Sequence, residues 1–349
     1  MRKADSMPPK KRRMFYNDDG NGHMLAHRGP FRTEMVTDSL DPLLGTPVTT
    51  FVLCVSYSDV LTYPSKVEEM FGWRDVPFVH TSPHYRYVLE FYRHVRKEGW
   101  DIPKMVMERA VQKGLEFVPS MRMNDAHFGQ GLKPLEHPLT GKFWGNEYLL
   151  DFRHEAVREY RLANAFELID RYALDGFEMD WTRHYTFFKP GEEQPDLITD
   201  MVRQVRRRLD ERGRQLGKKL ILIMRVAASI PDTLGCGLDV RTWVREGLVD
   251  YLAPSTPSRY IAFDMPIREW AELVEGTPVE IHASPDSAAP RGNAQATLEM
   301  YLAAASNYHS QGAHGFYFFN MHCRYEPKLV DVDLHVKYDF CGRDHASDC

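Results

Sequence analysis

The sequence predicts an α/β protein of the TIM-barrel type, a single (β/α)8 domain. The first observation is a polar helix end, a glycine and a short apolar run, which recur five times along the 349 residues, as in Gln112-Lys-Gly-Leu-Glu-Phe-Val-Pro119. Glycine is favoured just past a helix end because it adopts φ > 0 without a Cβ clash. Helix-length segments separate these joints, so helices and strands alternate, as in a parallel sheet.

The second observation is the number of strands that the apolar runs indicate. Eight are expected, near 14–18, 48–56, 115–122, 176–181, 219–226, 250–255, 278–283 and 315–320. Between two of them, Leu162, Phe166 and Ile169 follow helical spacing, with polar Arg158 and Glu159 on the opposite face. Eight such units in this length fit a TIM barrel. An open doubly wound sheet is the alternative, but no GxGxxG or P-loop follows any of these strands.

The chain divides into a basic N-terminal tail at 1–13, a barrel at 14–325 and a poorly defined C-terminal tail at 326–349. The tail contains Pro8-Pro-Lys-Lys-Arg-Arg13 with no apolar segment behind it, which is not a secretory signal. The sequence as written therefore predicts a cytoplasmic protein. A start codon assigned too far downstream would hide a true signal and allow a secreted or periplasmic location.

Composition narrows the class of protein. With 43% hydrophobic and 27% charged residues and no run of roughly 18 apolar residues, no membrane span is expected. A net charge of −5 gives no reason to expect a nucleic-acid partner. The five cysteines form no CxxC pair and no His-x-His spacing occurs, so we expect no disulfide framework, metal or cofactor. The sequence does not indicate an oligomeric state.

Residues 175–183, Asp-Gly-Phe-Glu-Met-Asp-Trp-Thr-Arg, carry the clearest functional signal. Side chains alternate along a strand, so Phe177 and Met179 share an apolar face while Glu178 and Asp180 share the other. Two carboxylates that close resist ionising together, which suits acid–base chemistry. Asp180 is the leading general acid, although a structural ion pair with Arg183 or Arg225 would also explain it. Glu178, one step deeper, either acts itself or positions its neighbours.

Other polar residues follow the expected strands, at the barrel face where TIM-barrel chemistry collects. Glu280 or Asp125 is the expected second carboxylate. The residues expected to bind a sugar are Asp18, Arg122, Asn124, His127, Arg183, Arg225, His282 and Asn320, with the aromatic rings of Trp181 and Tyr185. Carboxylates transfer protons or attack, while arginine, asparagine and histidine bind hydroxyls. Structural explanations remain for several of these: an Asx turn at Asp18, an outward orientation for Glu280 and His282, and packing for the aromatic residues.

Five segments resemble a known family. They are Arg122-Met-Asn-Asp-Ala-His127, Val157-Arg-Glu-Tyr, Arg171-Tyr-Ala-Leu-Asp-Gly-Phe-Glu-Met-Asp180, Gly237-Leu-Asp-Val-Arg-Thr-Trp-Val244 and Gly315-Phe-Tyr-Phe-Phe-Asn320. Together they are similar to the bacterial glycosyl-hydrolase-like proteins related to family 10. The resemblance implies a TIM barrel acting on glycosidic bonds, without fixing the glycan.

A second resemblance is partial. Asp175-Gly-Phe-Glu-Met-Asp-Trp-Thr182 is similar to the chitinase-type strand motif, in which alternating acids end in a catalytic Glu. Thr182 stands at that last position and cannot usefully donate a proton. Nor does the strand end in the Asn-Glu pair of family 10 xylanases. The acid is then Asp180 or Glu178, with its partner elsewhere.

The sequence as a whole predicts a glycoside hydrolase that cleaves a poly- or oligosaccharide with two carboxylates. Two alternatives remain: a catalytically silent carbohydrate-binding barrel, and a metal-dependent barrel lyase or isomerase. The first requires that only one carboxylate reach the cleft. The second requires three or more Asp, Glu or His side chains at one point.

Overall fold

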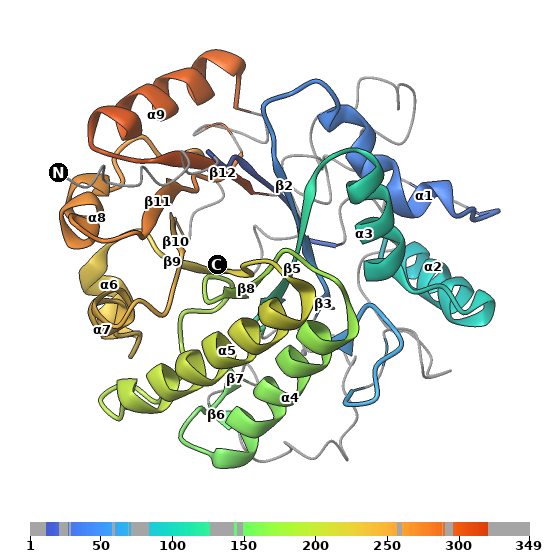
Figure 1. Cartoon of the computed structure of the whole chain (residues 1–349), viewed down its shortest axis with the longest axis horizontal. Helices are drawn as coiled ribbons and strands as arrows, with labels where there is room; N and C mark the ends of the chain where they lie inside the picture. Colours follow the sequence, from blue (N-terminus) through green and yellow to red (C-terminus); the bar gives the residue numbers. More distant parts are fainter. Residues whose placement is uncertain are drawn as a thin grey trace, which may run out of the picture.

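A closed barrel of eight parallel strands forms the centre of the protein, as the sequence predicts (Figure 1). In this computed structural model the described residues are 12–20, 27, 29–57, 60–68, 70, 84–125, 143–144, 149–256, 260–287, 289 and 296–319. The barrel strands are β1 (Phe15–Asp18), β2 (Thr50–Cys54), β5 (Glu116–Arg122), β8 (Gly176–Asp180), β9 (Ile221–Ala227), β10 (Tyr251–Ser255), β11 (Glu280–Ala283) and β12 (Gly315–Phe319). Strand β1 pairs with both β2 and β12, which closes the ring.

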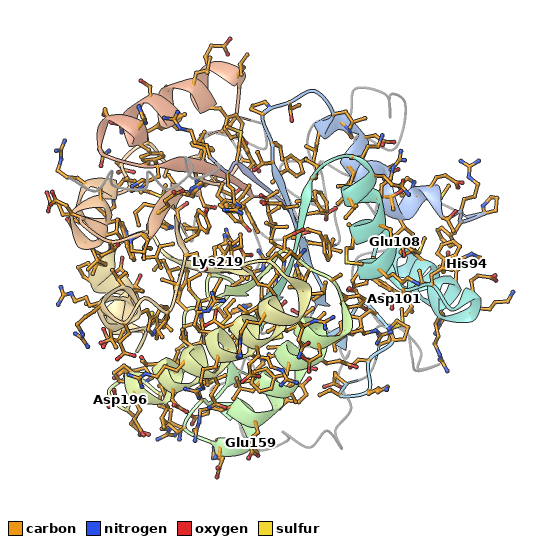
Figure 2. All side chains as sticks on the ribbon, viewed as in Figure 1. His94, Asp101, Glu108, Glu159, Asp196 and Lys219 are labelled. Atoms are coloured by element: carbon orange, nitrogen blue, oxygen red, sulfur yellow. The ribbon has the colours of Figure 1, made fainter. Side chains whose placement is uncertain are left out.

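Helices surround the barrel and connect consecutive strands (Figure 1). They are α1 (Glu34–Thr37), the 3-10 helix η2 (Asp38–Leu43), α2 (His84–Glu98), α3 (Ile102–Gln112), α4 (Glu155–Arg171), α5 (Pro195–Leu216), α6 (Ile230–Gly235), α7 (Val240–Arg245), α8 (Ile267–Val274) and α9 (Leu298–Ser310). Charged residues such as Glu159 on α4 and Asp196 on α5 are exposed on the outside (Figure 2). Within the described ranges, no helix is long and apolar enough to cross a membrane.

The glycine joints have the conformation that the sequence predicts. Gly114 lies between α3 and β5 with φ +72°, and Gly217 ends α5 with φ +66°. The joints at 247, 276 and 312 also have positive φ. Each of these glycines precedes a barrel strand, so the joints lie at the N-terminal end of the barrel, opposite the ends from which the βα loops leave.

Alternation along the strands separates the interior of the barrel from its outer core. Phe15, Val52, Val118 and Tyr317 are among the residues that fill the interior. The outward residues, such as Phe177 and Met179 of β8, pack under the helices in a second, larger cluster. The inward positions of β8 carry Glu178 and Asp180 instead of apolar side chains, as expected for a strand that ends in a site.

Two short antiparallel pairs lie on the side of the barrel from which the βα loops leave. Strands β3 (Ser56–Tyr57) and β4 (Val60–Leu61) pair directly after β2. Strands β6 (Phe143–Trp144) and β7 (Leu149–Leu150) pair between β5 and α4. The tails expected at 1–13 and 326–349 lie outside the described residues except for Arg12 and Arg13.

Candidate active site

Three polar side chains lie next to one another where β5, β8 and β9 approach their C-terminal ends. Arg122 on β5 is the ladder partner of Asp180 on β8, and Asp180 is in turn the partner of Arg225 on β9. All three are almost completely buried. Because parallel strands end at one face of the barrel, the sequence brings these charges together simply by placing them at equivalent positions.

Asp180 is held by donors on both of its carboxylate oxygens. The backbone N–H and the hydroxyl of Thr182 donate to Oδ1 at 2.9 and 2.6 Å. Arg225 Nη1 donates to Oδ2 at 3.3 Å and to the Thr182 hydroxyl oxygen at 2.5 Å. An ionised carboxylate is an acceptor only, and both oxygens are used here as acceptors. Thr182, at the position where a chitinase-type strand has its acid, therefore fixes the orientation of Asp180.

Glu178 lies one step deeper and is fully buried. The hydroxyl of Tyr317 lies 2.8 and 3.0 Å from its two carboxylate oxygens. Burial, followed by repulsion from the Asp180 carboxylate, raises the pKa of Glu178 to about 7, while Tyr317 and Arg225 act in the opposite direction. Glu178 is thus a buried acid that titrates near neutrality, beneath the carboxylate that lies at the end of the strand.

A second charged cluster surrounds Arg122. Its guanidinium Nη1 lies 2.9 Å from Asp125 Oδ2 and its Nη2 lies 3.4 Å from Asp19 Oδ2. The ring nitrogen Nδ1 of His184 lies 3.9 Å from the other oxygen of Asp125. Burial lowers the pKa of Arg122, but Cys54 and then these carboxylates outweigh it and raise the pKa well above its usual value. The cluster joins the loops that follow β1, β5 and β8.

Tyr185 and Phe319 complete the surroundings of Arg225. The hydroxyl of half-buried Tyr185 donates to the backbone oxygen of Ser255 at 3.2 Å, which ties the loop after β8 to the end of β10. The Arg225 guanidinium lies 3.6 Å from the centre of the Phe319 ring, a cation–π contact. Arg225 is therefore held by Asp180, Thr182 and Phe319.

Two of the residues expected to line the cleft have structural contacts instead. The Asn124 amide donates to the backbone oxygens of Leu150 and Thr186 and accepts from the Leu150 N–H, so it holds two rim loops together. Asp18 is completely buried, and its Oδ1 accepts the Gly20 N–H at 2.8 Å in an Asx turn. It occupies an outward position of β1, because Phe15 and Asn17 take the inward ones.

Glu280 and His282 lie at the wrong end of the barrel to serve Asp180. Glu280 is the first residue of β11 and pairs with Tyr251, the first residue of β10, whose hydroxyl receives a hydrogen bond from Arg13. These positions belong to the N-terminal end, whereas Asp180 ends its strand. The expectation that Glu280 supplies the second carboxylate does not fit this position, because β11 begins at this residue.

His282 is buried inside the barrel, where it pairs with Glu280 at 3.3 Å and packs against the rings of Phe15 and Tyr251. A sugar-binding role at the C-terminal rim does not fit this position. Burial lowers the pKa of His282.

The position of Trp181 also does not fit the expectation that it lines the cleft. Its side chain is fully buried and packs against the rings of Phe152, Phe187 and Trp243. It continues the outward face of Phe177 and Met179, so it belongs to the core beneath the helices. The packing explanation holds for Trp181 and Phe187, which leaves Tyr185 as the aromatic residue of the expected platform.

Three expected site residues remain, and the structure describes only one of them. Arg183 is half-buried in the loop after β8. His127 and Asn320 lie outside the described residues. Asp19 and His184 are among the polar residues that follow the first and fourth expected strands, but the sequence assigned neither of them a role, and it did not indicate Tyr317. The inward alternation of Gly315-Phe-Tyr-Phe-Phe could have revealed Tyr317, whereas only the three-dimensional contact with Arg122 identifies Asp19.

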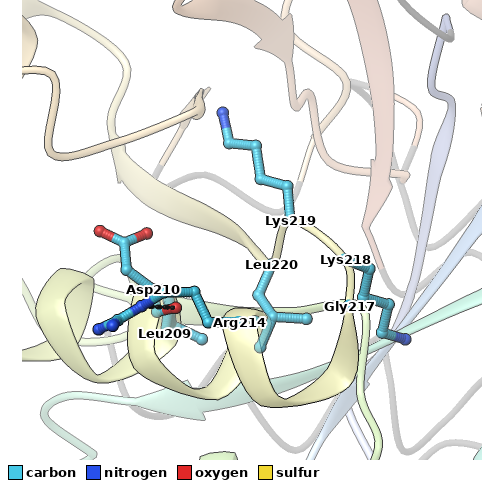
Figure 3. A pocket seen from close by; sticks show the side chains of 8 residues that line it. Leu209, Asp210, Arg214, Gly217, Lys218, Lys219 and Leu220 are labelled. Carbon is cyan, nitrogen blue, oxygen red and sulfur yellow. Dashed lines mark hydrogen bonds between the residues drawn. The ribbon is translucent and has the colours of Figure 1, made fainter.

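In the part of the chain that the structure describes, no group of three or more His, Cys, Asp or Glu side chains converges as a metal site would require. A surface hollow of about 430 Å³ lies at the end of α5 and the start of β9 (Figure 3). Two of its cations, Lys218 and Lys219, pair with Asp175 and Asp250. Because these lysines precede β9, the hollow is at the N-terminal end of the barrel.

No protein-family model and no curated protein matches this sequence. Several glycoside hydrolases are among the solved structures that resemble it. The PgaB (BpsB) glycoside hydrolase domain from Bordetella bronchiseptica is 10% identical, with a TM-score of 0.48 and coverage of 95% of this chain and 99% of that one. A GH20 exo-β-N-acetylglucosaminidase from Vibrio harveyi is 9% identical, with a TM-score of 0.46 and coverage of 95% and 54%.

An Ostrinia furnacalis group IV chitinase is 13% identical, with a TM-score of 0.44 and coverage of 78% of this chain. The chain spans 66% of the length of that chitinase. At these identities and TM-scores the similarity does not identify a reaction, so the functional argument has to come from the site.

Proposed function

We propose that this protein is a glycoside hydrolase whose essential carboxylate is Asp180. The observation that carries the proposal is the arrangement around Asp180: an acceptor-only carboxylate at the end of a barrel strand, fixed by Thr182 and Arg225. A carboxylate in this position can remove a proton from water or stabilise the positive charge that develops on the sugar ring.

The contacts of Asp180 favour the role of base over the role of acid that the strand pattern suggests. A general acid must carry a proton before the reaction, whereas Thr182 and Arg225 donate all three of these hydrogen bonds to the Asp180 carboxylate. Arg225 holds a positive charge directly against the carboxylate. Glu178 is too deeply buried to touch a substrate, so its role is to set the charge beneath Asp180.

One observation favours the carbohydrate-binding alternative. Asp125, the remaining candidate for the second carboxylate, is held in an ion pair with Arg122. If no other group exchanges a proton with the substrate, Asp180 stands alone and hydrolysis lacks its usual pair.

The experiment is a screen of the purified protein against a panel of poly- and oligosaccharides and aryl glycosides, with released reducing ends or aglycone measured. The proposal expects turnover on at least one glycan. Saturable binding of a glycan with no release of product would instead support the binding barrel.

A further inference from the structure

We propose that His184, oriented by Asp125, supplies the proton that the leaving group requires. The inference rests on the proposed glycosidase function and names the partner of Asp180 in it. His184 is the catalytic residue of this pair, and Asp125 is a positioning residue because it acts through the imidazole.

Asp125 is placed to orient a neighbour and not to meet a substrate. One of its oxygens is held by Arg122 at 2.9 Å. Its other oxygen faces the Nδ1 atom of His184 at 3.9 Å. At this distance the contact is an ion pair, in which the carboxylate stabilises the imidazolium form and favours the ring orientation that faces it.

The side chain of His184 is partly exposed to solvent, whereas that of Asp125 is buried. Of its side chain, 26% is exposed, so a substrate can reach the ring. The loop that carries it is anchored on the residues that follow: Tyr185 binds the Ser255 backbone, Thr186 accepts from Asn124, and Phe187 is buried in the core. A histidine on such a fixed loop keeps its place while a substrate binds.

Arg122 connects the His184–Asp125 pair to Asp180. Arg122 is the ladder partner of Asp180, and the same arginine holds Asp125, which faces His184. His184 also follows Asp180 by only four residues. Arg122 therefore links the two groups, as the ladder neighbour of Asp180 and the ion-pair partner of Asp125.

The reaction balances with water as the only co-reactant. Asp180 takes a proton from water as the water oxygen bonds to the anomeric carbon, and the bond from that carbon to the leaving oxygen breaks. The leaving oxygen takes the proton from protonated His184. Asp180 then gives up its proton to solvent and His184 regains one, which restores the starting state.

The test compares His184→Gln with His309→Gln, a control at an exposed histidine of α9. On a natural glycan, His184→Gln should lower kcat by roughly 10²–10⁴-fold, the usual contribution of a general acid. On a nitrophenyl glycoside, whose leaving group needs little protonation, the loss should be below about tenfold by the same reasoning. The control should match the wild-type protein on both substrates.

The pH–rate profile gives a reading that a structural role would not produce. An acid must be protonated, so the wild-type rate should fall on the alkaline side, and His184→Gln should lose that limb. Asp125→Asn should move the limb to lower pH, because the imidazolium loses its stabilising carboxylate.

The outcomes distinguish the role of His184 from the glycosidase function on which it rests. If the wild-type protein cleaves a glycan and His184→Gln, folded by circular dichroism, cleaves it at the rate of His309→Gln, the assignment of His184 is overturned and the glycosidase stands. If the wild-type protein cleaves no glycan in the panel, the function falls and the assignment falls with it.

Discussion

The hydroxyl of Tyr317 on β12 lies within hydrogen-bond distance of both carboxylate oxygens of Glu178 on β8, 2.8 and 3.0 Å away across the barrel interior. The contact places an ionisable group in the interior directly beneath Asp180. Such a group makes the stability of the fold depend on pH, and this dependence can be measured without a substrate.

Glu178→Gln should remove this dependence. The pKa of Glu178 is raised from its usual 4.5 to about 7, so between these values the folded protein binds a proton that the unfolded chain has released. The stability contribution of this residue is therefore fully present below pH 4.5 and is lost as pH rises through 7. The wild-type protein should lose up to about 3 kcal/mol relative to Glu178→Gln between pH 4.5 and pH 8.

Urea unfolding of both proteins at pH 5 and pH 8 provides the measurement. An equal difference between the two proteins at both pH values would show that Glu178 keeps its ordinary ionisation in the folded state.

His282 should make stability depend on pH in the opposite direction. Burial lowers its pKa in the folded protein. As pH falls below about 6.5, His282 is therefore protonated in the unfolded chain while it stays neutral in the folded protein. Stability is fully present above pH 6.5 and is lost as pH falls toward the lowered value. Glu280, His314 and Tyr251 are the titratable groups near the ring, and Glu280 partly opposes the shift.

His282→Gln removes this titration. The loss of wild-type stability between pH 7.5 and pH 5.5, followed by chemical denaturation, should be smaller in the variant. A variant that follows the wild-type pH dependence in parallel would assign the effect to other groups.

Gly114→Val tests the position of the helix–strand joints. A Cβ at this glycine would meet nothing within 4 Å, so the cost arises from the backbone, whose φ is +72°. A β-branched residue there should lower the free energy of unfolding by roughly 1–2 kcal/mol. Because the joint is at the end opposite Asp180, turnover per folded molecule should not change. Reduced turnover at an unchanged melting temperature would place the joint near the site.

Tyr185→Ala tests the part of the aromatic platform that faces the rim. If the ring stacks on a sugar, the variant should bind a glycan more weakly by roughly 1–2 kcal/mol in titration calorimetry. Tyr185→Phe is the matched control, since it keeps the ring and removes only the hydrogen bond to Ser255. Equal affinity of all three proteins would leave the residue with a structural role.

The fold follows from the sequence more completely than the site does. Strand positions could be predicted because apolar runs and glycine joints are local signals, and each expected strand overlaps an observed one within a few residues. The alternation in β8 likewise gives Glu178 and Asp180 their shared face. Glu280 is expected at the site because it lies in a predicted strand, but it is the first residue of β11, and the start of a parallel strand lies at the end of the barrel opposite the site.

The other site residues depend on contacts between segments that are far apart in the sequence, which is why the sequence did not predict them. In the sequence Asn124 resembles a residue that binds substrate, but its side-chain amide donates hydrogen bonds to the backbone oxygens of Leu150 and Thr186. His184 acquires a role only through Asp125, which lies 59 residues earlier and is held by Arg122. Such pairings depend on which loops meet above the barrel, and no periodic pattern encodes them.

The most direct test of the central claim is the turnover of Asp180→Asn, with Asp200→Asn on the exposed face of α5 as control. Asparagine keeps the size of the side chain but cannot take a proton from water. The variant should lose roughly 10²–10⁴-fold in kcat. As a base, Asp180 should be required equally for a natural glycan and for a nitrophenyl glycoside, whereas the control should match the wild-type protein. A folded Asp180→Asn protein that turns over its glycan at the wild-type rate would contradict the account.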